Sequence, residues 1–290
     1  MKINVLTLFL FLGYCLVSCT GPRNIYSSSP LVSPVPLEKG AAAIEVNYFA
    51  HTRQNNVRDS IPGNRDNCFG VTFSKMLKDR VLAFTFADLK REHNQFNDST
   101  RDRNNFDYND FNAGFDSSVV SGKRYTMGGG IEFFSNTEER VIRSLAVSSA
   151  FHHFSLNDSG FLLGTPYRRF YKVDQLTFSI QGNLLFRISD RFNLAAVTRL
   201  TILHSFRAHT DYSADEKLNA GLRDKRATVF VSLLPTLYAD YRLLRKTPLY
   251  ISSQFFNDLT LWEHTFTEYE PGRIYMKGTG ASLGIKYVFQ

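Results

Sequence analysis

The stretch QLTFSIQGNLLFRI, residues 175–188, decides the fold class of this chain. In an extended backbone its apolar and polar side chains fall on opposite faces. The apolar face carries Leu176, Phe178, Ile180, Leu184, Phe186 and Ile188, and the polar face carries Gln175, Thr177, Ser179, Gln181, Asn183 and Arg187. Alternation over this length predicts a β-strand much longer than the ~5–6 residues of a typical globular strand.

A second long strand is predicted directly after the first. Residues 189–191 make a short turn, and the alternation resumes through residues 192–207. Two alternating segments joined by a short turn predict a β-hairpin. If this hairpin lies in a membrane, we expect its apolar face to meet the hydrocarbon. The residues that we expect there include Phe178, Ile180, Leu184 and Leu200.

The same pattern recurs along the chain, and we count ten such segments. They cover residues 44–51, 69–74, 82–86, 125–133, 144–152, 175–188, 192–207, 229–241, 249–255 and 281–289. Their connections alternate between short turns and long loops rich in Asn, Asp, Ser and Gly. The turns are 78–80, 136–139, 189–191 and 244–247, and the loops are 51–67, 90–122, 157–169, 208–226 and 257–273.

Tight turns on one side and long loops on the other are typical of an outer-membrane barrel. We therefore predict an all-β fold: an antiparallel up-and-down transmembrane β-barrel of about ten strands. An even strand number places both chain ends on the short-turn side. A soluble two-sheet sandwich is the alternative, but its strands would be shorter and its connections less regular.

The start of the chain predicts export. Lys2 precedes an apolar run of about 15 residues, which is short for a membrane-spanning helix and typical of a secretory signal. Leu16-Val17-Ser18-Cys19 resembles the lipobox of bacterial lipoproteins, and the resemblance implies cleavage before Cys19 and acylation of its thiol. We predict three parts: a signal peptide (1–18), a lipid-anchored Pro/Ser-rich tether (19–39) that stays periplasmic, and the barrel (40–290).

The end of the chain carries a second signal. Ser282, Gly284, Tyr287 and Phe289 match the C-terminal β-signal of outer-membrane proteins, although Gln290 follows the final aromatic residue. That resemblance implies engagement of the barrel-assembly machinery. The combination of lipobox, barrel and aromatic richness is similar to proteins of Bacteroidota-type envelopes.

Composition limits the other classes of protein. The chain holds 26 Phe and 14 Tyr, and its mean hydropathy is −0.22, so apolar residues are interleaved with polar ones. This pattern argues against a helical membrane protein. The net charge of +7 favours contact with anionic lipid headgroups over nucleic acid in an exported protein. Cys68 has no partner for an intramolecular disulfide, and we interpret it as a buried thiol.

Strand parity, by which alternate residues of a strand point to opposite faces, predicts charges inside the barrel. Three acids (Glu45, Glu132 and Asp240) are expected at a similar depth to three bases (Arg187, Arg242 and Lys286) near the short-turn end, with Arg199 and Arg207 deeper on the next strand. Buried charges are costly unless paired, so we interpret this set as a structural plug. A narrow, gated pore biased toward anions remains the alternative.

Enzymatic function is a weaker hypothesis. Barrel enzymes such as omptin-like proteases and lipid A deacylases need a histidine with an acid, or a Ser-His-acid set, near the outer rim. His51 and His152 are expected to point inward there, and His152-His153 is the best general-base candidate. The acidic and aromatic loop 92–121 resembles no calcium-loop pattern, and we expect it to fold on itself or to form a recognition surface.

The sequence therefore predicts a non-enzymatic outer-membrane lipoprotein barrel that acts as a structural or accessory component. Its expected partners are outer-membrane lipids, the assembly machinery and an envelope protein bound through the rim and loops. We expect no cofactor, metal or nucleic acid. A narrow channel is the first alternative, and a surface hydrolase is the second.

Overall fold

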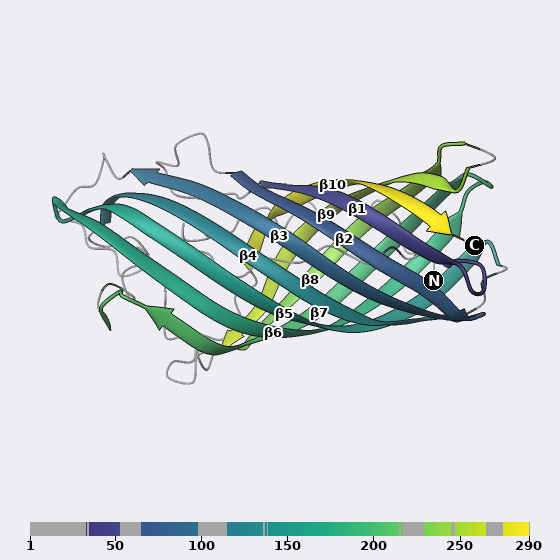
Figure 1. Ribbon diagram of the computed structural model, residues 1–290, viewed down its shortest axis with the longest axis horizontal. Coiled ribbons are helices and arrows are strands. Elements are labelled where there is room, and N and C mark those ends of the chain that lie inside the picture. Colours follow the sequence, from purple (N-terminus) through teal and green to yellow (C-terminus); the bar gives the residue numbers. More distant parts are fainter. Residues whose placement is uncertain are drawn as a thin grey trace, which may run out of the picture.

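A computed structural model describes residues 33, 35–52, 65–97, 115–135, 137, 139–214, 216, 229–244, 247–264 and 275–289. In this part of the chain ten antiparallel strands close into a single barrel (Figure 1). The strands are β1 (Ala42–Thr52), β2 (Arg65–Lys78), β3 (Val81–Asn97), β4 (Phe115–Phe134), β5 (Val141–Leu162), β6 (Thr165–Arg187), β7 (Phe192–Thr210), β8 (Val229–Arg242), β9 (Leu249–His264) and β10 (Tyr275–Phe289).

Each strand pairs with its neighbours in the chain, and β1 pairs with β10 to complete the ring. The predicted fold class and the count of ten are thereby confirmed. No helix in the described residues is long and apolar enough to cross a membrane.

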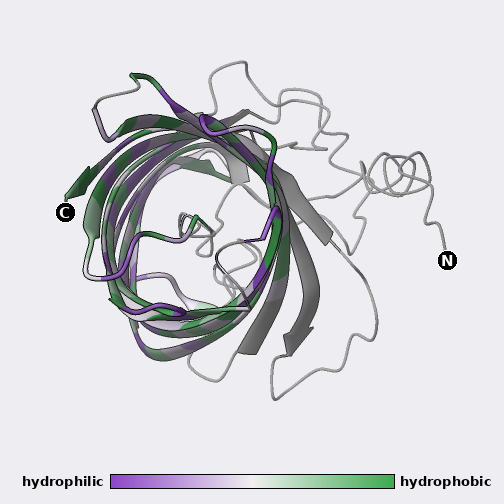
Figure 2. Cartoon of the chain, turned by 90° about the vertical axis from the view of Figure 1, so that its right-hand side faces the viewer, coloured by the Kyte–Doolittle hydropathy of each residue, from purple (hydrophilic) through white to green (hydrophobic). Residues whose placement is uncertain are grey.

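An apolar belt surrounds the outside of the barrel. On β5 the outward side chains from Val141 to Phe151 include four exposed apolar residues, Val141, Leu145, Val147 and Phe151, with Arg143 and Ser149 between them. These ten residue steps span about 33 Å along the strand, or about 25 Å along the barrel axis at a tilt of about 40°. That height equals the apolar band of outer-membrane barrels. Seen from the short-turn end, apolar and polar positions alternate along the strands (Figure 2).

One predicted loop is wrong. Residues 157–169 do not form a long loop, because β5 and β6 continue in register to the pair Leu162 and Thr165. The strands are joined by Leu163 and Gly164, whose φ angles are +49° and +77°. Positive φ at both central residues matches the type I′ turns that connect twisted strands most tightly. The hairpin thus runs far past the apolar belt.

The lower lumen, toward the short turns, is filled largely by apolar side chains. Buried residues there include Met76, Leu82, Phe134, Leu185 and Val197. On β3 the inward face is therefore apolar at this level, contrary to the expectation that apolar residues point to lipid. Phe84 pairs with Gly130 and Phe86 with Gly128, and a Cβ at either glycine would lie 2.6–2.7 Å from the facing ring. The glycines of β4 make room for these rings.

The chain enters the lower lumen before its first strand. Val35 and Leu37 pack against the lower apolar cluster, and Ser33 hydrogen-bonds the Tyr238 hydroxyl at 2.9 Å. Within the predicted tether of residues 19–39, the described Ser33, Val35 and Leu37 thus contact the lower lumen, while Glu38 and Lys39 are exposed.

Candidate functional site

Three of the predicted lumen charges meet near the short-turn end. The Lys286 ammonium forms an ion pair with the Asp240 carboxylate, and both side chains are buried. The Tyr238 hydroxyl donates to Asp240 at 3.3 Å. Glu45 is also buried and accepts a hydrogen bond from the Ser252 hydroxyl at 2.5 Å. Parity placed these residues correctly, and the arrangement ties β1, β8, β9 and β10 together.

The remaining predicted members are arranged differently. Glu132 is fully buried, but its carboxylate accepts hydrogen bonds from Ser144 at 2.5 Å and Asn183 at 2.8 Å instead of forming the predicted ion pair with a base. Arg199 is buried in the lumen.

Three of the predicted bases are not in the lumen interior. Arg187 is exposed at the end of β6, so its predicted membership of the network is wrong. Arg242 is half-buried at the rim and donates to the Thr247 carbonyl at 3.5 Å. Arg207 is also exposed, because a register shift between Asp174 and Gln175 interrupts the alternation at that point.

A second set of buried charges lies higher in the lumen, and sequence reasoning missed it. Arg124 donates to Asp88 at 3.1 Å, and Lys90 lies 2.9 Å from Glu92, with all four side chains buried. The thiol of Cys68 is buried as expected and donates to Asp88 at 3.7 Å. Strict parity extended along β3 would have found Asp88, Lys90 and Glu92 on one face.

The paired histidines point to opposite sides of β5. His152 lies inside and hydrogen-bonds Thr126 and Thr177, each at 2.9 Å. His153 lies outside, 2.7 Å from Asp174. The two rings therefore do not form one catalytic unit. Cys19, the side chain of His51, and residues 98–114 of the predicted loop lie outside the described side chains, while the ends of that loop are strand.

The four residues of the C-terminal pattern have two different surroundings. Ser282 is buried inside, and Gly284 lies where a Cβ would approach Asn47 Oδ1 to 1.9 Å. Tyr287 and Phe289 are exposed on the belt, and their ring centroids are 5.0 Å apart. Gly284 therefore has a packing role in the closed barrel, whatever its role during assembly.

Above the belt, the inner faces of β4, β5 and β6 build a second core. Its buried apolar members are Val120, Phe154, Leu156, Tyr171, Val173 and Tyr212. At its centre the buried Asp158 carboxylate accepts hydrogen bonds from Tyr167 at 2.7 Å and Tyr212 at 2.5 Å. Because a buried carboxylate needs such donors, this arrangement fixes the residues after β7 against the hairpin.

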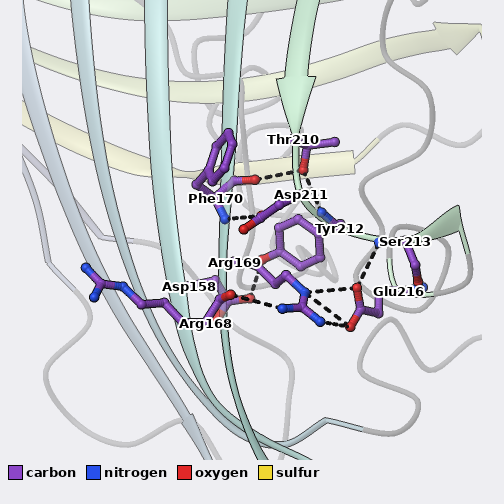
Figure 3. Close-up of polar contacts among 9 residues, drawn as sticks. All are labelled: Asp158, Arg168, Arg169, Phe170, Thr210, Asp211, Tyr212, Ser213 and Glu216. Atoms are coloured by element: carbon purple, nitrogen blue, oxygen red, sulfur yellow. Dashed lines mark hydrogen bonds and ion pairs between the residues drawn. The ribbon is translucent and has the colours of Figure 1, made fainter.

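The segment that follows β7 is fastened at several points (Figure 3). Arg169 donates to both carboxylate oxygens of Glu216, at 2.7 to 3.2 Å. Ser213 and Glu216 exchange backbone-to-side-chain hydrogen bonds, the reciprocal pattern of a capping box. Hydrogen bonds from Arg169 are the main cause of the lowered pKa of Glu216. The Phe170 amide also donates to Asp211 at 2.6 Å.

The tip of the hairpin is apolar and exposed. Leu163 is 78% exposed in the left-handed conformation, and Phe161 nearby is 49% exposed. A branched side chain in this conformation costs about 1–2 kcal/mol relative to glycine or asparagine. The tip therefore holds a strained, apolar side chain on a rigid support outside the lipid belt.

Comparisons with known proteins give no family for the chain. Neither a family description nor a curated protein matches the sequence. Several solved outer-membrane barrels resemble it weakly. The transport unit of the autotransporter AIDA-I from Escherichia coli has a TM-score of 0.49 and 10% identity, with 90% of this chain and 93% of that chain covered.

Two other solved structures compare similarly. The translocator domain of the autotransporter NalP from Neisseria meningitidis has a TM-score of 0.47 and 9% identity, with coverage of 87% and 90%. Ail, the attachment invasion locus protein of Yersinia pestis, has a TM-score of 0.33 and 12% identity, with coverage of 87% and 99%. At these scores the fold assignment rests on the strand pairing of this chain itself.

Proposed function

We propose that this protein is a non-enzymatic bacterial outer-membrane β-barrel that holds a rigid hairpin outside the cell as a binding surface for a partner protein. The observation that carries this proposal is the β5–β6 extension. From Phe151 to Leu162 the strand continues for about 36 Å beyond the belt, with a core of its own.

The tip is the part of the extension best suited to binding. Phe161 and Leu163 are exposed, whereas the inner face of the hairpin is covered by Tyr212 and its neighbours. Exposed apolar side chains on a preorganised support are typical anchors of protein interfaces.

The filled lumen favours a binding role over a channel. Apolar side chains, with Val35 and Leu37, occupy much of the lower end, and the second core lines the inner faces of β4, β5 and β6 above the belt. Paired charges occupy the space between. In planar bilayers we expect no conductance steps from the purified protein, and regular steps would contradict this part of the proposal.

The binding role is tested by photo-crosslinking in intact cells. A photoreactive residue at position 161 should give a discrete adduct, and the added substitution Leu163→Asn should remove it. Asn-Gly is the preferred pair for this turn, so the variant keeps the hairpin while losing the apolar tip. The control is Leu244→Asn, which alters an exposed leucine at the opposite end. An adduct unchanged by Leu163→Asn would refute the assignment of the tip.

We further propose that the chain is a lipoprotein acylated at Cys19, with its N-terminus in the periplasm and its long strands outside. The lipobox resemblance supports the acylation. The even strand number supports the orientation, since the start of β1 and the end of β10 lie at the same, short-turn end.

A further inference from the structure

A row of basic side chains crosses the outside of the barrel above the apolar belt, two outward rows beyond Phe151. Arg91, Lys123, Ser155, Lys172 and His209 are successive cross-strand neighbours on β3 to β7. The four basic members are all exposed on the outer face. At about 4.8 Å between strands, the row is roughly 19 Å wide.

The rows on either side carry further basic groups. Arg207 lies one row closer to the belt, opposite Asp174, and Arg168 lies farther out on β6. Asp174 is the acid that faces outward on the described parts of β3 to β7, and it already pairs with His153 at 2.7 Å. This outer face, which we call the basic collar (Arg91, Lys123, Arg168, Lys172 and Arg207), therefore has a net positive charge.

The collar begins where the lipid-facing surface ends. The lowest row of the collar, which holds Arg207, also contains Leu89 and Tyr125. One row farther down, Phe151 on β5 is in ring contact with Phe206 on β7, with ring centroids 6.2 Å apart. Aromatic residues mark the membrane interface in barrels of this type. The cations therefore lie at the level of lipid headgroups, with their aliphatic stems beside the belt.

The height of the collar indicates the kind of headgroup. From Asp174 to Arg168, β6 rises six residues, about 20 Å along the strand and about 15 Å along the barrel axis. The headgroup layer of a phospholipid bilayer is only about 5–8 Å thick on each side. A taller basic face fits a sugar headgroup that carries its phosphates above the acyl chains.

We propose that the basic collar binds the phosphate groups of the glycolipid in the outer leaflet. Lysine and arginine recognise phosphate by charge-assisted hydrogen bonds. The attraction between opposite charges is stronger beside an apolar region than in bulk water, because the local dielectric is lower. The inference rests on the proposed outer-membrane location, and it names a lipid ligand for a surface distinct from the hairpin tip.

The test measures binding of purified lipid A to the full-length protein in neutral detergent, with dephosphorylated lipid A and phosphatidylglycerol as parallel probes. The double variant Lys123→Glu/Lys172→Glu should bind lipid A at least about 30-fold more weakly, since each cation near a lipid surface contributes roughly fivefold. Lipid A without phosphate should bind the wild-type protein as weakly as the variant binds lipid A.

The matched control is Lys75→Glu/Arg143→Glu, which changes the net charge equally on outward positions near the opposite rim. Its affinity for lipid A should equal that of the wild type. Equal loss in both double variants would overturn the proposal as a net-charge effect. Binding of phosphatidylglycerol as tight as that of lipid A would overturn the assignment to the glycolipid.

The experiment also separates this inference from the proposed function. Heat-modifiable gel mobility shows whether each variant is a folded barrel that inserts into vesicles. Failure of the wild type to insert would refute the membrane proposal, whereas normal insertion with unchanged lipid A binding in the Lys123/Lys172 variant would refute the collar alone.

Discussion

Replacing Ile180 with arginine tests whether the outer surface of the barrel faces lipid hydrocarbon. Ile180 is 52% exposed and is flanked on β5 and β7 by Val147 and Leu200, which also point outward. Val147 lies six residues above Val141, about 15 Å along the axis, and four residues below Phe151, about 10 Å. The site is therefore near the middle of the belt.

An arginine near the midplane of such a barrel costs about 2–4 kcal/mol. Ile180→Arg should accordingly lower the folding equilibrium constant about 30- to 700-fold. The measurement is guanidinium unfolding in lipid vesicles, followed by fluorescence and by gel mobility. Asn157→Arg introduces the same residue on the outer face of β5 above the belt, where we expect a cost of at most about 1 kcal/mol.

A third variant separates lipid exposure from crowding. Ser179 is inward, and its hydroxyl lies 2.9 Å from that of Thr201, so Ser179→Arg avoids lipid but crowds the lumen. Equal destabilisation by Ile180→Arg and Asn157→Arg would refute the placement of the belt. Equal unfolding of the Ile180 and Ser179 variants in both detergent and bilayer would refute the assignment of inner and outer faces.

Three further predictions follow from single residues. Cys19→Ala should abolish labelling by an alkyne fatty acid, and persistent labelling would remove the lipoprotein proposal. The lowered pKa of Glu216 means that its carboxylate stabilises the folded segment above pH 4.5, the ordinary value, and that this contribution is lost as the pH falls through the lower, folded pKa. Protease resistance of residues 211–216 should therefore decline below pH 4.5. The variant Glu216→Gln should have weaker resistance at neutral pH, and its resistance should depend less on pH. A pH profile in that variant equal to that of the wild type would contradict the role of the ion pair with Arg169. Gly284→Ala should destabilise the barrel by about 1–3 kcal/mol through overpacking. Adding Asn47→Ala should relieve part of the loss, because Ser252 Oγ also lies 2.5 Å from the added Cβ, whereas no relief at all would contradict overpacking against Asn47.

Alternation predicted the barrel because lipid imposes a strict chemical difference between the two faces of a strand. Within the belt, the pattern of Leu176, Phe178 and Ile180 against Gln175 and Thr177 was correctly interpreted. Above the belt the two faces exchange character: Phe154 and Leu156 point inward into the second core, whereas the outer face is polar, so the pattern of the belt does not continue. The strands of the β5–β6 extension were for that reason assigned to a loop.

The lumen was harder to predict because its contents depend on packing across the ring. Glu45, Asp240 and Lys286 were placed correctly by parity alone. Arg187 was not placed correctly, because it is the last residue of β6 and is exposed there. The inward turn of Phe84 depends on Gly130 of the next strand, a pairing that is known only once the register is fixed.

The placement of the earliest described residues has a consequence for the kinetics of folding. Ser33 contacts Tyr238 and Lys286, which are 205 and 253 residues away in sequence. Contacts of such separation form late, because much of the intervening chain must first be ordered. Until β10 arrives, β1 also presents an unpaired edge. We therefore expect the contacts of Ser33 at the lower mouth to form in the same final step in which β1 pairs with β10. Chains truncated before β10 should accumulate as open, protease-sensitive sheets rather than as smaller barrels.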